Sequence, residues 1–425
     1  NLSIHWNFVT APYAVSGISP VKFFFDNGSP RKDEPVNPEQ HPLHSWLVET
    51  RRDFHRHPEL GLKEFRTTAR IKEILTGLGA RFQDLPGLET GAVAIFEGRP
   101  GPKTLALRAD IDALPMDELN DVPYKSTLPG VMHSCGHDCH ATVMLGVAKH
   151  VVESGLLTKI KGRLKFVFQP AEEIVAGARR MIDAGVLENP KVDRILALHM
   201  NTDLPAGQVG LYKGVSHAHT DSFQLVIQGK GVHGARPHDG IDPIVAGAHF
   251  VTALQSIVGR NVDPLDAAVI SVGQFTAGTA PNIIPDQASL RGTVRTFKLE
   301  VRALVRERLQ DMAESLQKSF RVAVDYRFIP GVASTINDEA VAADLYAAAV
   351  SVLGAENVSY LTPKMGGEDF GLFTQMVPGA FMRLGCANEA RGVTAKGHSP
   401  HFDVDETSLP IGVEVMTEAI RAYLK

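Results

Sequence analysis

The feature that most constrains this fold is a regular alternation of short apolar segments with segments of helical spacing. The apolar segments are GAVAIF (91–96), TLALRA (104–109), RLKFVF (163–168) and RILALH (194–199). Helical spacing lies between them over 141–153 and 177–185. Apolar strands that alternate with helices are typical of an α/β domain with a largely parallel central sheet, buried on both faces.

The same pattern flanks these segments on both sides. Leu43, Leu47 and Phe54 recur at helical spacing, and a second helix around Ile71 ends at Gly79, a good C-terminal stop. Near the end of the chain, a helix over 338–353 precedes a strand-like AFMRLG (380–385).

A different order interrupts this pattern between about 216 and 331. It predicts strands at 222–229, 267–275, 288–297 and 322–329, with helices at 243–259 and 299–319. This βαββαβ order is that of a ferredoxin-like unit. We therefore expect a discontinuous catalytic domain, 42–215 plus 332–425, with a small domain inserted at 216–331.

Residues 1–41 fit neither pattern. They include an apolar patch over 21–25 but lack the basic start and the long apolar core of a signal peptide. We interpret them as an extension or a truncation remnant and leave them out of the fold prediction.

Composition excludes several classes of function. The 425-residue chain has a net charge of -5 and no basic stripe, which argues against nucleic-acid binding. No apolar run approaches the roughly 18–20 residues that a membrane span needs. Its three cysteines are too few for a disulfide framework, so we expect a reducing, cytoplasmic compartment.

Acidic residues and a histidine follow the predicted strands. Asp110 and Asp112 follow TLALRA, Glu172 and Glu173 follow RLKFVFQPA, and RILAL ends on His199. In open α/β sheets, ligands bind beyond the carboxyl ends of the strands. These side chains are therefore predicted to meet at one edge of the sheet, where a metal site could form.

The densest cluster of reactive side chains is HSCGHDCH (133–140), just before a predicted helix. The thiolate of Cys135 and the imidazole of His137 can reach one metal pair from a single turn, and Gly136 lets the backbone bend tightly. Two alternatives stay open. Cys135 could be a nucleophile with a nearby histidine as its base, or the segment could be a polar loop with a buried thiol.

Metal-assisted amide hydrolysis needs one carboxylate ligand and one free carboxylate base, and the Glu172–Glu173 pair could supply both. An adjacent pair of glutamates is also common at a solvated helix start, and the residues alone leave the order of the two roles open. His199 and His398 are weak candidates singly, since a lone histidine is more often a core or surface residue.

Taken together, the motifs resemble the M20 metallopeptidase superfamily. The resemblance is closest to the amidohydrolase branch of hippurate hydrolases, N-acyl-amino-acid amidohydrolases and auxin-conjugate hydrolases. The matching segments run from about residue 42 to the end of the chain. They are RRDFHRHPELGLKEF (51–65), LALRADIDALPM (105–116), HSCGHDCHATVMLG (133–146), VFQPAEE (167–173), ALHM (197–200), GKGVHGARPHDGIDPI (229–244), PNIIPDQASLRGTVRTF (281–297), MGGEDF (365–370) and GHSPHFDVDE (397–406).

The resemblance implies a role for each candidate. The metal ligands would be Cys135, His137, Glu173, His199 and His398, with Cys135 touching both ions. Glu172 would be the general base. Asp110 would not bind a metal itself but would orient either a ligand or the base. His233 would steady the oxyanion in a neighbouring subunit's active site, while Asn282 and Arg295 would contact substrate.

We therefore expect a dinuclear metal amidohydrolase that cleaves N-acyl amino acids with a metal-activated water. Manganese or zinc are the expected ions, with nickel or cobalt also compatible with the ligands. The inserted domain would serve as a lid and as the contact of a homodimer or a higher homo-oligomer. The alternatives are a dipeptidase or carboxypeptidase of the same superfamily, a cysteine hydrolase, and an inactive binding protein on the same fold.

One departure from the family pattern concerns Cys139. It stands where the family usually has glycine or alanine, and we expect it to place a further thiol beside the metals.

Overall fold

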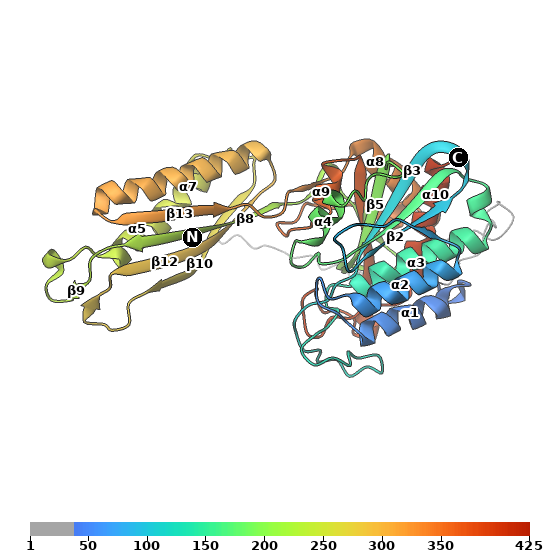
Figure 1. Cartoon of the computed structure of the whole chain (residues 1–425), viewed down its shortest axis with the longest axis horizontal. Helices are drawn as coiled ribbons and strands as arrows, with labels where there is room; N and C mark the ends of the chain where they lie inside the picture. The colour runs from blue at the N-terminus through green and yellow to red at the C-terminus, as the bar shows by residue number, and fades with distance from the viewer. Residues whose placement is uncertain (1–37) are drawn as a thin grey trace, which may run out of the picture.

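A computed structural model describes residues 38–425 of the chain, which form two units (Figure 1). The predicted N-terminal extension therefore lies, up to residue 37, outside the described residues. Its last part belongs to the folded body. The short helix η1 (Pro38–Gln40) leads into His41, which is buried and lies 3.0 Å from Glu414 through its Nε2 atom.

The larger unit is built on an eight-stranded sheet in the order β1-β2-β4-β3-β5-β16-β6-β15. Its strands are β1 (Arg81–Phe82), β2 (Ala92–Glu97), β3 (Arg99–Asp110), β4 (Lys161–Gln169), β5 (Arg194–Pro205), β6 (Val209–Leu211), β15 (Val358–Tyr360) and β16 (Gly379–Ala387). The four central strands β4, β3, β5 and β16 are parallel, and antiparallel pairs flank them. This confirms the predicted α/β class with a mostly parallel sheet.

Helices cover both faces of this sheet because successive strand residues point to opposite sides. On β3, Leu105 and Leu107 join one core, while Ala106 joins the other. The helices of the first, larger core are α1 (His44–Arg56), α2 (Phe65–Gly77), α3 (His137–Glu153), α8 (Glu339–Leu353) and α10 (Ser408–Tyr423). Those of the second are α4 (Gly177–Asp183) and α9 (Gly371–Thr374).

Three elements differ from the sequence prediction. Helix α3 begins at His137, so the second half of the HSCGHDCH cluster is its first turn rather than a preceding loop. Strand β5 does not end on His199 but continues to Pro205. Helix α10 was not predicted; it is buried almost all round, with every residue from 408 to 417 buried, so no single apolar stripe marks it.

The smaller unit has the predicted βαββαβ order. Its strands are β8 (His219–Gln228), β10 (Ala268–Ala277), β12 (Gln287–Thr296) and β13 (Ala323–Ile329), and its helices are α5 (Pro243–Ala253), α6 (Gln255–Arg260) and α7 (Leu299–Phe320). The strands form an antiparallel sheet in the order β10-β12-β8-β13. The three helices cover one face of it, so the fold class predicted for the insert is confirmed.

Two chain segments connect the units side by side. Thr220 donates its backbone N–H to the carbonyl of Val332 at 3.0 Å, and Ser334 donates to Nδ1 of His219 at 3.0 Å. A Cβ atom at Gly331 would lie 1.8 Å from the carbonyl oxygen of Thr220, so only glycine fits this crossing. The domain limits at 216 and 331 remain a proposal that this crossing supports.

Two simpler predictions concern membranes and disulfides. Within residues 38–425, no helix is long and apolar enough to cross a membrane. All three cysteines of the chain, Cys135, Cys139 and Cys386, are free thiols.

The close packing of α3 against α1 and α10 leads to a stability prediction. A methyl group at Gly146 would lie 2.6 Å from Cδ2 of Leu47 and 2.8 Å from Cγ2 of Val413. We expect Gly146→Ala to lower the free energy of unfolding by roughly 1–3 kcal/mol through overpacking, despite the better helix propensity of alanine. Thermal unfolding followed by circular dichroism measures this.

The matched control is Gly77→Ala, because nothing lies within 4 Å of a Cβ atom at that helical position. This variant should be neutral or up to about 1 kcal/mol more stable. Equal midpoints for the two variants would contradict the packing described for α3.

Candidate metal centre

A pocket of about 270 Å³ lies where the two units meet. The larger unit contributes most of its walls, and the smaller unit and the crossing contribute Thr220, Arg295 and Val332. Its lining includes four of the five predicted ligands and Glu172; these residues are Cys135, Glu172, Glu173, His199 and His398. The fifth predicted ligand, His137, is buried just behind this lining.

Cys135 and His137 are held at the start of α3 by a tight bend at Gly136. The φ of Gly136 is 94°, and a Cβ atom there would lie 2.9 Å from Cγ of Met200. Only glycine combines this left-handed backbone with such a close approach. The bend turns both side chains toward the carboxyl end of the parallel strands, as the sequence predicted.

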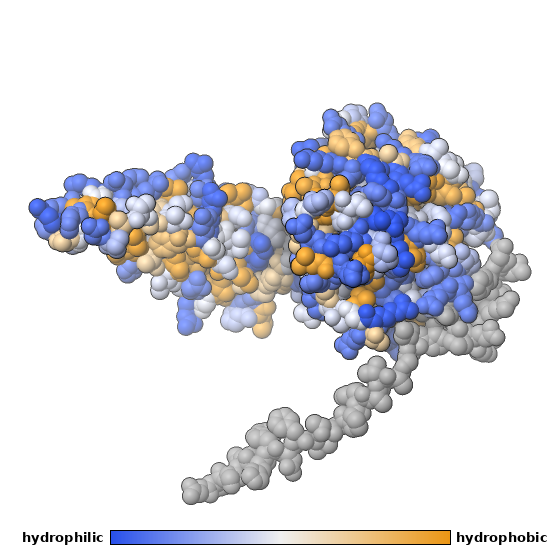
Figure 2. Space-filling model, turned by 90° about the horizontal axis from the view of Figure 1, so that it is seen from below, coloured by the Kyte–Doolittle hydropathy of each residue, from blue (hydrophilic) through white to orange (hydrophobic). Residues whose placement is uncertain are grey.

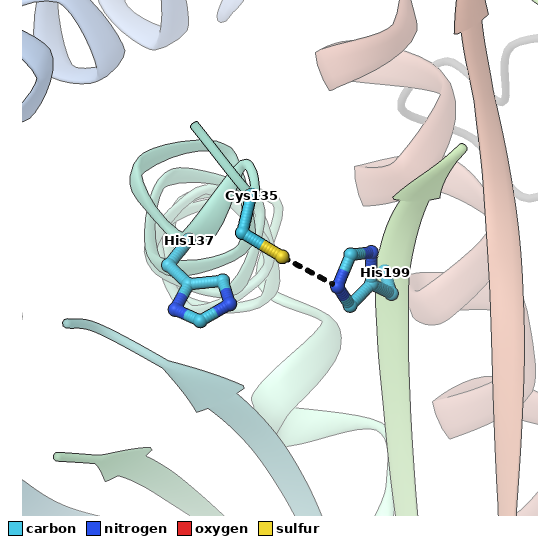
Figure 3. Close-up of side chains that lie close together, drawn as sticks. All are labelled: Cys135, His137 and His199. Atoms are coloured by element: carbon cyan, nitrogen blue, oxygen red, sulfur yellow. Dashed lines mark hydrogen bonds between the residues drawn. The ribbon is translucent and has the colours of Figure 1, made fainter. Parts of the chain in front are cut away.

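His199 faces Cys135 from the neighbouring strand β5 (Figure 3). Its Nε2 atom lies 3.4 Å from Sγ of Cys135, and its Nδ1 atom lies 2.7 Å from the carbonyl of Met200. Because a carbonyl only accepts, Nδ1 carries the proton and Nε2 is left with a lone pair. That is the tautomer in which a histidine binds a metal through Nε2.

The glutamate pair follows β4 on a strained loop. Ala171 and Val175 flank the pair with φ values of 54° and 57°, which non-glycine residues rarely adopt. The carboxylate of Asp112 accepts the backbone N–H groups of both Glu172 and Glu173 at 3.0 Å. These bonds hold the loop so that both glutamates line the pocket.

His398 reaches the same place from a distant loop. Its backbone N–H donates to the carbonyl of Ser134 at 2.7 Å, and its φ is 62°. Its Nε2 atom lies 3.4 Å from Oε1 of Glu173. Backbone strain at three residues in or beside the proposed ligand set is typical of a functional site.

The donor atoms of the proposed ligands lie in two groups, each of which could hold one cation. Cys135, His137 and His199 offer donor atoms within 4.8 Å of one another, and so do Cys135, Glu173 and His398. Nε2 of His137 and Oε1 of Glu173 are buried and make no hydrogen bond within residues 38–425. Buried polar atoms are rarely left without a partner, so these two indicate an absent ligand.

The protonation of the Cys135–His199 pair argues against a cysteine nucleophile. Burial raises the pKa of the Cys135 thiol. Burial, aided by Arg383, lowers the pKa of His199 well below its ordinary value. A catalytic cysteine needs the opposite shifts, toward a thiolate beside an imidazolium. A divalent cation would supply the positive charge that this thiolate needs.

Glu172 lies beside the proposed ligands, with a carboxylate oxygen within 4.8 Å of donor atoms of His137 and Glu173. Its Oε1 atom accepts the backbone N–H of Asp369 at 3.4 Å. Burial raises the pKa of Glu172 well above its ordinary value, and the nearby carboxylates of Glu368 and Asp369 add to this effect. A carboxylate with raised pKa is suited to accept a proton.

Asp112 is a residue that the sequence analysis placed at the site but gave no role of its own. Besides the two glutamate amides, its carboxylate contacts Nδ1 of His137 at 3.2 Å. The resemblance implies a supporting role for Asp110. Its carboxylate contacts His140 at 2.5 Å and Arg108 at 2.8 Å, and lies 3.7 Å from Nε2 of His137. The sequence feature that could have identified Asp112 is its position: like Asp110, it follows the predicted strand at 104–109.

The predicted residues of the insert are divided between two places. Arg295 lies at the crossing end of β12, opposite Thr220, and lines the pocket. His233 and Asn282 lie together on the exposed ribbon formed by β9 (Val232–His233) and β11 (Ile283–Ile284), at the far end of the insert (Figure 1). They do not line the pocket of their own chain.

The prediction for Cys139 is wrong. Its side chain is fully buried in the hydrophobic core of the larger unit, because it lies on the face of α3 that points away from the pocket.

A buried ion network joins the segments that carry the ligands. Arg51 on α1 contacts Asp138 at 2.8 Å, Asp403 at 2.9 Å and Glu406 at 3.3 Å. Asp138 follows His137 directly, whereas Asp403 and Glu406 belong to the loop after His398. One guanidinium thus fixes two distant segments relative to each other.

Comparisons with known proteins agree with this site. The sequence pattern of peptidase family M20/M25/M40 matches residues 106–422. The chain is 38% identical over 376 residues to N-acetylcysteine deacetylase of Bacillus subtilis (strain 168), covering 88% of this chain and 96% of that protein. It is 37% identical over 373 residues to thermostable carboxypeptidase 2 of Saccharolobus solfataricus, covering 87% and 93%.

Two further similarities bear on function. The chain is 37% identical over 383 residues to the IAA-amino acid hydrolase ILR1-like 4 of Arabidopsis thaliana, covering 89% of this chain and 86% of that protein. Its structure is similar to that of the Bacillus subtilis YXEP protein, described as a dinuclear metal binding peptidase from the M20 family. The TM-score is 0.79 at 35% identity, covering 90% of this chain and 98% of that one.

The Arg51 network leads to a second prediction. Arg51→Met would leave Asp138 buried without its cation, and we expect the free energy of unfolding to fall by roughly 3–5 kcal/mol. Arg52→Met is the matched control, because Arg52 is partly exposed and, within residues 38–425, its only carboxylate partner is Glu406. Its loss should be below about 1 kcal/mol. Chemical denaturation of both variants measures the difference, and similar losses would contradict the network's importance.

Proposed function

The chain belongs to the peptidase family M20/M25/M40, and from this premise we propose that it is a dinuclear metal amidohydrolase acting on N-acyl amino acids. The observation that carries the proposal is the pair of donor groups that share Cys135, together with Nε2 of His137 and Oε1 of Glu173, two buried atoms that make no hydrogen bond within residues 38–425. The names of the deacetylase and of the IAA-amino acid hydrolase support the choice of an amide bond to an amino acid.

The proposed metal ligands form two sets. One ion would be held by Cys135, His137 and His199, and the other by Cys135, Glu173 and His398. The proposal of two ions is supported by the name of the dinuclear structural neighbour. A mixed sulfur, nitrogen and oxygen ligand set suits zinc or manganese, which we propose, and also nickel or cobalt.

The bound cations would lower the pKa of a water molecule and polarise the acyl carbonyl. The residues of the chain perform the proton transfers. Glu172 takes a proton from the attacking water and then passes it to the departing amine. Asp112 keeps the glutamate loop and His137 in place, and we propose that Asp110 supports the site through His140.

The substrate would lie between the two units. Arg295 is the proposed partner of the substrate carboxylate, because a guanidinium binds a carboxylate through two parallel hydrogen bonds. Its Nη1 atom is held by the carbonyls of Asp221 at 3.3 Å and Val294 at 3.1 Å, and no carboxylate of residues 38–425 pairs with it.

A carboxypeptidase is the second candidate, favoured by the relative of that name. Both reactions release a free amino acid from an amide, so the same proton transfers serve either. Rates on hippurate, N-acetyl amino acids and dipeptides would separate the two.

The two glutamates yield the third prediction. Glu172→Gln should keep two metal ions per chain but lower kcat about 10²–10⁴-fold, since the base is lost and no ligand is removed. Glu173→Gln is the matched variant and should lower metal content, measured by elemental analysis. A hydrolysis rate of Glu172→Gln close to that of the wild-type enzyme would contradict the role proposed for Glu172.

We also propose that the insert forms a homodimer contact. Apolar side chains are exposed along its edge strand β10 and the adjoining helix α5, and Figure 2 shows hydrophobic surface along this unit. They are Ile244 and Val245 on α5, Val269 and Phe275 on β10, and Leu265 in the loop before β10. A dimer would also explain why His233 and Asn282 lie far from the pocket of their own chain, since the partner's His233 could complete it. We place this soluble dimer in the cytoplasm.

Subunit mixing supplies the fourth prediction. Glu172→Gln and His233→Ala should each be inactive alone, but a mixed dimer contains one site with an intact base and the partner's His233. Random exchange should therefore restore about a quarter of wild-type activity. Mixtures that stay inactive, while light scattering shows dimers, would exclude a role for His233 across the interface.

A further inference from the structure

Arg383 is a buried cation in the wall of the proposed active site. It lies on β16, opposite His199 on the adjacent parallel strand β5, and its guanidinium lines the pocket. Its relative exposure is 8%. The guanidinium carbon lies 5.2 Å from the ring centre of Phe381, which supports one side of it.

This arginine differs from the other buried arginines of residues 38–425, which are Arg51 and Arg108. Each of those contacts three carboxylates within 4 Å. No carboxylate of the described chain lies that close to Arg383, and its Nε atom makes no hydrogen bond there. A buried charge without a counter-charge is strongly unfavourable, so an anion is expected at this position when the site is in use.

A chain of neutral groups fixes the direction of this guanidinium. Its Nη2 atom donates to Nε2 of His217 at 2.6 Å, since arginine can only donate. His217 must then carry its proton on Nδ1, which donates to Oγ of Ser216 at 3.1 Å. The Ser216 hydroxyl in turn donates to the carbonyl of Thr335 at 3.2 Å. This chain orients Arg383 without neutralising its charge.

Two guanidinium groups therefore face the pocket without carboxylate partners, Arg383 from the larger unit and Arg295 from the smaller one. A substrate with a single carboxylate would satisfy one of them and leave the other unpaired in a pocket of about 270 Å³. A substrate with two carboxylates would satisfy both.

Building on the proposed function, we propose that Arg383, oriented by His217, binds a second carboxylate, so that the preferred substrates are N-acyl amino acids with two acidic groups. The second carboxylate lies either on the amino-acid side chain or at the end of the acyl chain. Arg383 is thus a specificity-determining residue beside the metal centre.

Paired substrates test this proposal and distinguish the two positions. N-acetyl-L-glutamate is compared with N-acetyl-L-glutamine, and N-succinyl-L-alanine with N-succinamoyl-L-alanine, using the metal-loaded enzyme. In at least one pair, kcat/KM should be about tenfold or more higher for the acid. Arg383→Gln should lower kcat/KM for the acid far more than for the neutral member, which removes the preference, and Arg383→Lys should retain part of it.

Arg163→Gln is the matched control, because Arg163 pairs with Glu97 outside the pocket and should leave the preference unchanged. Hydrolysis of both neutral members without any acid preference would overturn the proposal and leave the proposed function standing. An equal loss for both members of a pair in Arg383→Gln would also overturn it, since Arg383 would then bind the carboxylate that all these substrates share.

Calorimetric binding of glutarate and of its monoamide tests the same guanidinium without turnover. Tighter binding of glutarate that Arg383→Gln abolishes supports the proposal even if no N-acyl amino acid is cleaved, in which case only the amidohydrolase function fails. Equal binding of the two compounds by the wild-type enzyme overturns the second-carboxylate site.

Discussion

The buried guanidinium of Arg108 is the interaction on which the site depends most. It contacts Asp110 at 2.8 Å on its own strand, Gln169 at 2.9 Å at the end of β4, and Glu368 at 3.1 Å and Asp369 at 2.8 Å from a distant loop. Through these contacts one cation joins the ends of two central strands to the loop that faces Glu172. Burial raises the pKa of Glu172, and Glu368 and Asp369 add to this effect, so the network around Arg108 also acts on the proposed base.

Most of the fold could be predicted from periodicity, because buried strands and two-faced helices leave clear patterns in a sequence. His199 shows why the strand-end argument worked although β5 continues beyond it. Pairing of β3 with β5 ends at Ala197, so His199 lies two residues beyond the last pair on that side, although β16 still pairs with it on the other. Asp112 could not be distinguished from Asp110, because both follow one strand and only the folded loops show which carboxylate meets His137. The placement of His233 on a remote ribbon likewise depends on tertiary structure.

Local strain concentrates where the chemistry is proposed. Of the six non-glycine residues with positive φ in the described chain, Ala171, Val175 and His398 lie in or beside the ligand set. Hydrogen bonds donated to the carboxylate of Asp112 and to the carbonyl of Ser134 hold these loops in place. The rigid sheet and the ion networks around Arg51 and Arg108 therefore stabilise conformations that the loops would not adopt alone.

The crossing between the units determines how a rotation of one unit against the other would change the pocket. Thr220 and Val332 bond to each other in the crossing and also line the pocket, and Arg295 follows on the next strand. The axis about which the units could rotate therefore runs along the pocket wall itself. Any rotation there moves Arg295 relative to Arg383, so the separation of the two guanidinium groups measures the angle between the units. A ligand that binds both arginines would favour one angle between the two units, and the length of the ligand would determine that angle.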